Sequence, residues 1–268
     1  AGLSSGSHYE VFMKLRTEVR DDVFIVTINR PEVRNCVDRE TAEALAEAFG
    51  GFDADDSLKV AVLTGEGGYF CAGADLKEAS SGGQNANKVK LEGDGPMGPT
   101  RMLLSKPVIA AVEGFAVAGG LELSVWCDLR VAARDAIFGV YCRRWGVPLV
   151  DGGTIRLPRL IGQSHAMDMI LTGRGVSSDE AVAMGLVNRL VEPGEALPAA
   201  IELAREIGSF PQLCMRNDRR SVINQWNLGM DDALKEETRL GIEVIRSGET
   251  QEGATRFTKG AGRHGAFE

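Results

Sequence analysis

Two glycine-rich segments have the residue types of a site that stabilises negative charge on an oxygen atom. The first spans 69–76 (YFCAGADL) and the second spans 114–122 (GFAVAGGLE). Each follows a strand-like run and leads into an expected helix start, where main-chain N–H groups have no partner inside the helix. Small residues let a ligand carbonyl approach such amides without meeting a side chain. Two amides converging from these segments would form a pocket for an oxyanion.

Glu122 adds an acid to the second segment. It lies three residues after Gly119, close to one helical turn, so its carboxylate can face the same pocket. A carboxylate there could move a proton while the amides hold the charge that develops on oxygen. The same spacing also fits two ordinary tight turns, with Glu122 as a helix-start acid that the helix dipole favours. The spacing alone leaves both interpretations open.

The sequence offers little support for a dinucleotide-binding loop, a serine triad or a histidine metal site. Two formal matches to the dinucleotide fingerprint, at 93–98 and 260–265, do not join a strand to a helix, as pyrophosphate binding requires. The three histidines are His8, His165 and His264, and two of them lie near the chain ends. A serine triad or a multi-histidine metal site is therefore poorly supplied. Carboxylates and backbone amides must carry the chemistry.

Composition limits the class of protein. The 268 residues are 44% hydrophobic and 25% charged, which is ordinary for a globular protein and excludes a disordered chain. A net charge of −8 argues against nucleic acid as the main partner. Five scattered cysteines without a Cys-x-x-Cys pair favour a reducing compartment, so we expect a cytoplasmic protein. The apolar stretch 107–127 contains two glutamates, so no membrane span is expected.

The elements that position the two segments follow an α/β pattern. Expected strands are 11–19, 23–29, 59–64, 107–114 and 129–133. Helices are expected from Asp38 to a stop at Gly50-Gly51 and around 119–126, and then at 164–171, 179–184, 196–207, 213–226 and 230–246. The polar segment 80–99, rich in glycine and proline, is expected to be a mobile surface loop and a candidate lid.

Five segments, in order, resemble the motifs of the crotonase (enoyl-CoA hydratase/isomerase) superfamily. They are INRPEVRN, FCAGADL, AVAGGLELSVWCD, WGVPLVDGGTIRLPRLIG and LTGRGVSSDEAVAMGLVNRLV. The resemblance covers about residues 10–265. It implies a spiral core of repeated ββα units over 10–195, after a flexible tail at 1–9. It also implies a helical C-terminal region over 196–268 that builds homotrimers, often stacked as hexamers.

The resemblance implies an enzyme that acts on acyl-CoA thioesters, in fatty-acid or related acyl-CoA degradation. Ala74 and Gly119 match the residues whose amides hold the thioester oxygen, and Glu122 matches the first of two hydratase glutamates. No metal and no separate cofactor is expected, since coenzyme A enters as part of the substrate. The family's CoA contacts map to Ala72, Asp75, Leu76, Lys77 and, near the C-terminus, Phe257. Arg30, Arg34 and Lys77 could meet CoA phosphates or be ordinary surface cations.

One position departs from the hydratase pattern. Cys142 stands where the second hydratase glutamate is expected, and a thiol that is mostly protonated at neutral pH replaces a carboxyl group poorly. Asp151 lies near the place where some family isomerases carry a second acid, so it is a candidate catalytic partner. The alternatives to a hydratase are a double-bond isomerase, a non-catalytic acyl-CoA-binding member, and a hydrolase or dehalogenase that uses Asp151.

Overall fold

The computed structural model describes residues 10–12 and 14–262, so the expected tail at 1–9 lies outside the described residues. The chain divides into two compact units, Ala1–Ile207 and Gly208–Glu268. Among the described residues, no helix has the length and apolar character needed to cross a membrane.

Two sheets form the first unit, and its α/β class is as expected. The larger sheet has the strand order β1-β2-β3-β4-β5-β7-β10. These strands are β1 (Glu10–Phe12), β2 (Leu15–Arg20), β3 (Val23–Ile28), β4 (Val60–Gly65), β5 (Val108–Val112), β7 (Leu129–Ala133) and β10 (Arg189–Val191). β1, β2 and β3 pair antiparallel, and the pairs from β3 onward are parallel. A smaller sheet, β6-β8-β9, comprises Phe115–Val117, Ile137–Gly139 and Gly175–Ser177.

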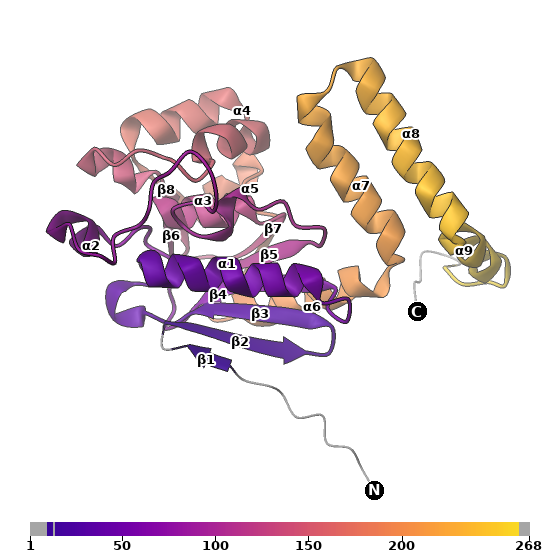
Figure 1. Cartoon of the computed structure of the whole chain (residues 1–268), viewed down its shortest axis with the longest axis horizontal. Helices are drawn as coiled ribbons and strands as arrows, with labels where there is room; N and C mark the ends of the chain where they lie inside the picture. Colours follow the sequence, from indigo (N-terminus) through magenta and orange to yellow (C-terminus); the bar gives the residue numbers. More distant parts are fainter. Residues whose placement is uncertain (1–9, 13, 263–268) are drawn as a thin grey trace, which may run out of the picture. The chain divides into compact units, whose positions relative to one another are not determined.

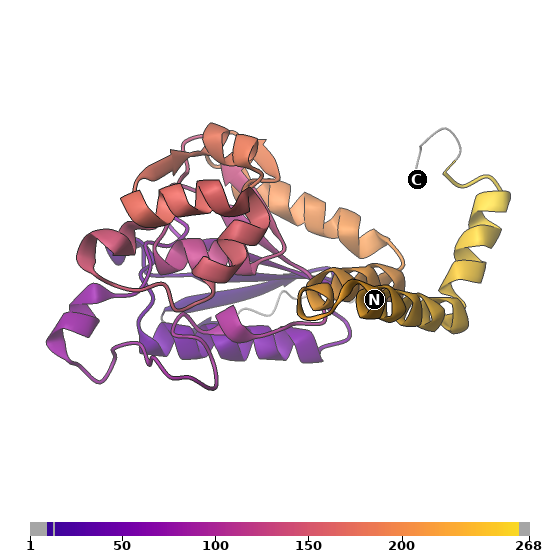
Figure 2. The ribbon, with the colours of Figure 1, turned by 90° about the horizontal axis from the view of Figure 1, so that it is seen from above.

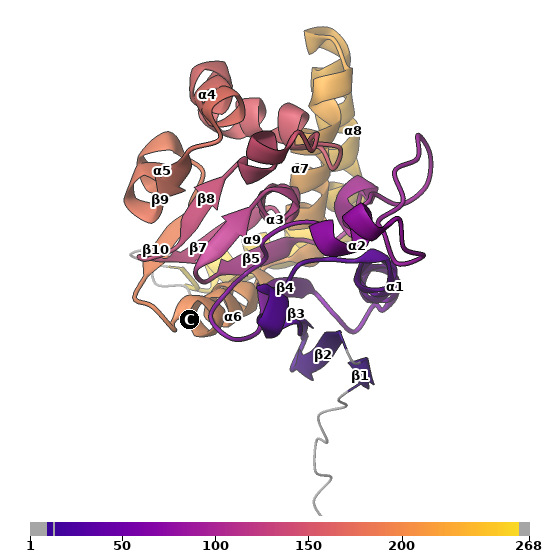
Figure 3. The same cartoon turned by 90° about the vertical axis from the view of Figure 1, so that its left-hand side faces the viewer.

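The larger sheet is covered on both faces. Alternation along β3 sends Val23 and Ile25 to one face, where they pack with α6 (Ala196–Ser209). Val26 and Ile28 face the other way, into the cluster that contains α1 (Arg39–Ala54). Figures 2 and 3 show α1 and α6 on opposite sides of the strands. α6 therefore belongs to the first unit, although the sequence grouped it with the C-terminal helices.

The expected end of α1 at Gly50-Gly51 is wrong, because the helix continues to Ala54. Its last turn buries Phe52, whose ring stacks on Phe24 with the centroids 5.8 Å apart. The burial of one aromatic ring contributes about 1.5–3 kcal/mol, which can offset the two glycines at about 1 kcal/mol each relative to alanine.

Three further helices carry or flank the glycine-rich segments (Figure 1). They are α2 (Leu76–Ser81), α3 (Gly119–Trp126) and α4 (Gly153–Thr172). α3 matches the expected bounds, and it is buried nearly all round, including its polar residues Glu122 and Ser124. The helix expected at 164–171 is the second half of α4, which bends at Gly162, where φ is +77°. α5 (Ser178–Met184) completes the unit close to its expected place.

The second unit contains the helices α7 (Gln212–Asn224), α8 (Met230–Ser247) and α9 (Glu249–Thr258). α7 and α8 agree with the expected ranges to within two residues, whereas α9 was not expected. The Asn217 side chain of α7 donates to the Leu240 carbonyl of α8 at 3.0 Å. Large apolar side chains remain exposed in this unit, including Val222, Met230 and Ile245.

Candidate active site

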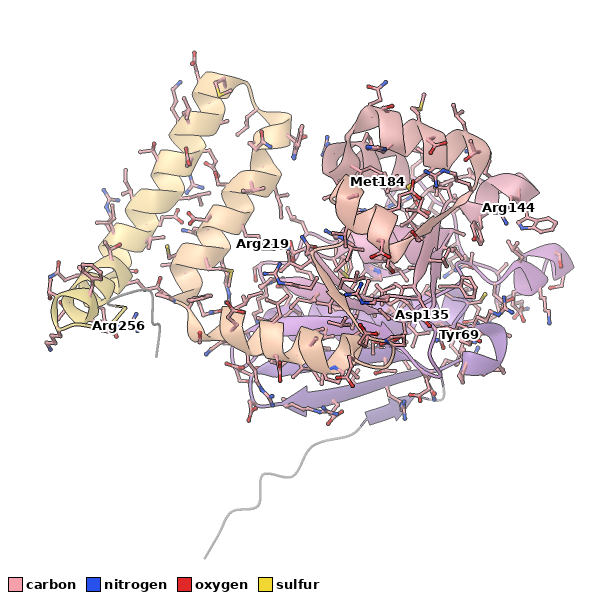
Figure 4. All side chains as sticks on the ribbon, turned by 180° about the vertical axis from the view of Figure 1, so that it is seen from behind. Tyr69, Asp135, Arg144, Met184, Arg219 and Arg256 are labelled. Atoms are coloured by element: carbon pink, nitrogen blue, oxygen red, sulfur yellow. The ribbon has the colours of Figure 1, made fainter. Side chains whose placement is uncertain are left out.

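Hydrogen bonds hold the two glycine-rich segments side by side. The Cys71 amide donates to the Phe115 carbonyl at 2.8 Å, and the Val117 amide donates back to the Cys71 carbonyl at 3.1 Å. Tyr69, labelled in Figure 4, stacks on Phe115 with the ring centroids 6.0 Å apart. Segments separated by some 45 residues in sequence therefore run in register up to the start of α3.

Glycines allow the closest approach between these segments. Gly73 has φ +101°, and a Cβ atom there would lie 3.0 Å from the Gly119 nitrogen. A Cβ atom on Gly120 would lie 2.0 Å from the Cys71 carbonyl oxygen, which no side chain could tolerate. The two corners can therefore adjoin only if these positions carry no side chain.

The amides of Ala74 and Gly119 are available at this junction. Within residues 10–12 and 14–262, neither N–H donates to a protein acceptor. The Gly119 amide is the first of α3, where the helix dipole adds positive potential. Both residues line the same cavity. The fold thus brings together the two amides that the sequence predicts for an oxyanion site.

The cavity at this junction has a volume of about 440 Å³. Most of its wall is apolar, and its aromatic members are Phe115, Tyr141 and Trp145. Arg34 also lines it, with the guanidinium 5.6 Å from the centre of the Phe115 ring. A wall of this kind suits an apolar acyl group, and its few polar groups would fix the orientation of that group.

Glu122 lies on the wall of this cavity and is only 2% exposed. Its Oε1 atom accepts hydrogen bonds from the amides of Asp151 at 2.9 Å and Gly153 at 2.8 Å. Burial raises the pKa of the carboxyl group to about 7, although the Gly153 donor and the charge of Arg156 act in the opposite direction. Near neutral pH, both protonation states are therefore populated, as an acid/base catalyst requires.

Asp151 lines the same cavity and is 3% exposed. Its Oδ1 atom accepts hydrogen bonds from the Met97 amide at 2.9 Å and from the Thr100 hydroxyl. Burial raises the pKa of this carboxyl group above its usual value. Two carboxyl groups, both less acidic than in water, therefore face one apolar cavity.

The segment that binds the Asp151 carboxylate, residues 97–100, was largely expected to belong to a mobile surface loop. Residues 95–100 are buried, so the end of the expected surface loop 80–99 packs inside the protein. Met97 fills the space above Gly119, where a Cβ atom would lie 2.7 Å from its sulfur. Met97 and Thr100 carried no motif, and only their contacts with Gly119 and Asp151, far away in sequence, show their role.

Cys142 lines the same cavity as Glu122. It belongs to the short 3₁₀ helix Tyr141–Trp145 and is buried. Burial raises the pKa of its thiol, and the charge of Glu122 raises it further. The thiol therefore stays protonated at neutral pH and cannot act as the base that a glutamate would supply.

The predicted CoA contacts divide into two groups. Ala72 and Leu76 line the cavity. Asp75 does not line it, because its carboxylate accepts the Lys77 amide at 3.2 Å as the cap of α2 and pairs with Arg30 at 2.9 Å. Lys77 is exposed outside the cavity lining. Phe257 belongs to α9 of the second unit and is 67% exposed.

Comparisons with known proteins agree with this geometry. The enoyl-CoA hydratase/isomerase family model matches residues 18–262. The chain is 38% identical over 253 residues to enoyl-CoA hydratase EchA19 of Mycobacterium tuberculosis, covering 90% of this chain and 92% of that protein. It is 37% identical over 224 residues to (E)-benzylidenesuccinyl-CoA hydratase of Thauera aromatica, covering 83% and 86%.

Solved structures extend the likeness to the fold. Enoyl-CoA hydratase EchA1 of Mycobacterium marinum is 40% identical and superposes with a TM-score of 0.86, covering 92% of this chain and 96% of that one. The two sheets and the C-terminal helices therefore form the crotonase fold. The chain belongs to the enoyl-CoA hydratase/isomerase family and is an enzyme of acyl-CoA thioesters.

Proposed function

We propose that the enzyme adds water reversibly to a 2-enoyl-CoA thioester. In this proposal the Ala74 and Gly119 amides hold the thioester oxygen, and Glu122 transfers the proton. The observation that carries it is the Glu122 carboxyl group, which two amides orient at 2.9 Å and 2.8 Å on the wall that also presents the free amides. Its pKa of about 7 suits both donation and acceptance.

The proposed reaction needs one carboxylate. Glu122 removes a proton from water while the water oxygen bonds to the β-carbon of the substrate. The electrons of the double bond move to the thioester, whose oxygen becomes an enolate stabilised by the amides of Ala74 and Gly119. Glu122 then gives its proton to the α-carbon, and the carbonyl re-forms. Because one group serves both carbons from one wall, hydrogen and hydroxyl add to the same face.

Asp151 is the second acid of the proposal. Its Oδ1 atom is fixed by Met97 and Thr100, and no protein donor within the described ranges binds Oδ2. Since its pKa is raised, it can hold a proton near the substrate at a higher pH than an exposed aspartate. We assign it a supporting role, such as ordering the water, because Glu122 alone completes the proton transfers.

A double-bond isomerase is the second candidate, and Cys142 is the observation that favours it. The thiol is uncharged and lines the cavity, and the resemblance implies that its position corresponds to that of the second hydratase glutamate. Without that carboxylate, Glu122 could move a proton between two carbons of the acyl chain and leave water out.

Turnover of an enoyl-CoA panel tests the proposal. The panel contains short, long and aromatic 2-enoyl thioesters in ¹⁸O-labelled water, with products measured by mass spectrometry. Incorporation of labelled oxygen supports hydration, whereas deuterium uptake from heavy water without net hydration selects the isomerase. Thermal stabilisation by CoA esters without any product selects a protein that only binds them.

The variant E122Q keeps the acceptor Oε1 and loses the titrating group. We expect turnover to fall at least about 100-fold while CoA-ester binding survives. The control is E47Q, which changes an exposed glutamate on α1. Unchanged turnover in E122Q would remove Glu122 from the mechanism.

We also infer that the enzyme works in the degradation of fatty-acid or related acyl-CoA compounds in the cytoplasm, as a homotrimer or hexamer. The exposed apolar side chains of the second unit support a subunit interface there. The five cysteines, all free and within the described residues, fit a reducing compartment.

A further inference from the structure

Arg156 joins Asp151, which lines the cavity, to Thr100, and neither Arg156 nor Thr100 belongs to the lining. Arg156 is the fourth residue of α4 and is only partly exposed. One guanidinium nitrogen donates to the Asp151 carbonyl at 2.9 Å, and another donates to the Thr100 carbonyl at 2.7 Å. The forked guanidinium serves the two carbonyls with two separate nitrogens held in one plane, whereas an ammonium group has a single nitrogen.

These bonds close a ring of contacts. Arg156 holds the main chain of Thr100 and of Asp151, while the Thr100 hydroxyl donates to the Asp151 carboxylate. The same turn, at Asp151 and Gly153, supplies both amides that hold Glu122. The position of the Glu122 carboxyl group therefore depends on the turn at 151–153, and Arg156 fixes the Asp151 carbonyl of that turn.

The backbone is shaped around this guanidinium. Gly152 has φ +92°, and a Cβ atom there would lie 2.2 Å from a guanidinium nitrogen of Arg156. Any side chain at 152 would have to displace Arg156 from the two carbonyls. The glycine between the two Glu122 donors is thus also the residue that leaves room for Arg156.

We propose that Arg156 is a positioning residue, which clamps the turn at 151–153 to the segment at 97–100 and thereby fixes Glu122 and Asp151 over the substrate. This inference rests on the proposed function, since it concerns the carboxyl groups assigned there. Arg156 touches neither the substrate nor the reacting atoms. Its effect passes through the two carbonyls, and its charge favours the ionised forms of both carboxyl groups.

The variants R156M and R156K separate these contributions. Methionine removes the clamp and the charge, so we expect kcat to fall about 100-fold, as an error of about 1 Å in a catalytic group can cause. KM should change little, because Arg156 itself does not line the cavity. Lysine keeps the charge but offers one donor nitrogen in place of two, so we expect a smaller loss. The control R159M changes an exposed arginine one turn further along α4.

Two readouts distinguish positioning from a merely structural role. In R156M the rise of kcat/KM with pH should move to higher pH, because the lost cation no longer favours the Glu122 carboxylate. R156K should keep the wild-type profile. In R156A, added guanidinium at a concentration below denaturation should restore part of kcat, whereas the same concentration of sodium chloride should not.

The outcomes also separate this inference from the proposed function. If the wild type turns over no enoyl-CoA, or if E122Q remains active, the proposed function fails. If the wild type is active and E122Q is not, but R156M matches R159M in kcat and pH profile, only the Arg156 inference is overturned. A loss of kcat in R156M with an unchanged profile and no rescue would also overturn it, since it would indicate a smaller folded fraction.

Discussion

Glu122 makes folding stability depend on pH in a direction that is unusual for a glutamate. The carboxyl group is 2% exposed, and its pKa is raised from 4.5 to about 7, chiefly by burial. The native state therefore binds this proton more tightly than the unfolded state does. The resulting stabilisation is fully present below the unfolded-state value of 4.5 and is lost as the pH rises through about 7.

The size of the effect follows from these two values. Between pH ~8.5 and pH ~5.5, protonation of Glu122 should add about 2 kcal/mol to the free energy of unfolding of the wild type. Glutamine does not titrate, so E122Q lacks this contribution. The difference in unfolding free energy between wild type and E122Q should change by that amount in favour of the wild type as the pH falls.

Denaturant unfolding at a series of pH values measures this difference directly. E47Q serves as the control, because it makes the same chemical change at an exposed position of α1. A flat difference for E122Q would mean that Glu122 ionises in the folded protein as it does in the unfolded chain. Burial would then not raise the pKa of Glu122, and this residue could not be the proposed acid/base catalyst active near neutral pH.

Two further substitutions test the neighbours of Glu122. In G119A the new methyl group would lie 2.7 Å from the Met97 sulfur. We therefore expect the Gly119 amide to be displaced and kcat to fall about 100-fold. A kcat close to that of the wild type would show that this amide does not hold the thioester oxygen. C142E places a second carboxyl group beside Glu122. We expect the midpoint of the kcat/KM profile to rise, because like charges disfavour ionisation, and an unchanged profile would show that Cys142 and Glu122 do not share the reaction space.

Helices and strands whose bounds are marked by the local sequence pattern were predicted well. α3 and β7 have the expected bounds because each is a mainly apolar run whose ends are marked by neighbouring turn residues. The expected end of α1 was wrong because a buried ring at Phe52, which depends on tertiary packing, offsets the two glycines. Local propensity could not reveal that contact.

In the candidate site, too, some residues could be predicted from local sequence and others only from tertiary contacts. The corner residues Ala74 and Gly119 and the acid Glu122 could be named from motifs, and the fold brings them to one cavity. Met97 and Thr100 could not be named, since they contact Asp151 across some 50 residues of sequence. Arg156 lay within a recognised motif, but only the carbonyls that it contacts indicate what it does.

In the proposed mechanism, main-chain amides hold both the thioester oxygen and the carboxyl group of Glu122. A substitution cannot delete an amide hydrogen unless it introduces proline. Side chains on the cavity wall, such as Cys142, can therefore vary while these amides keep their positions. A fold of this kind tolerates substitutions among the side chains that line its cavity. Single substitutions there can therefore accommodate new acyl groups while the proposed catalytic groups keep their positions.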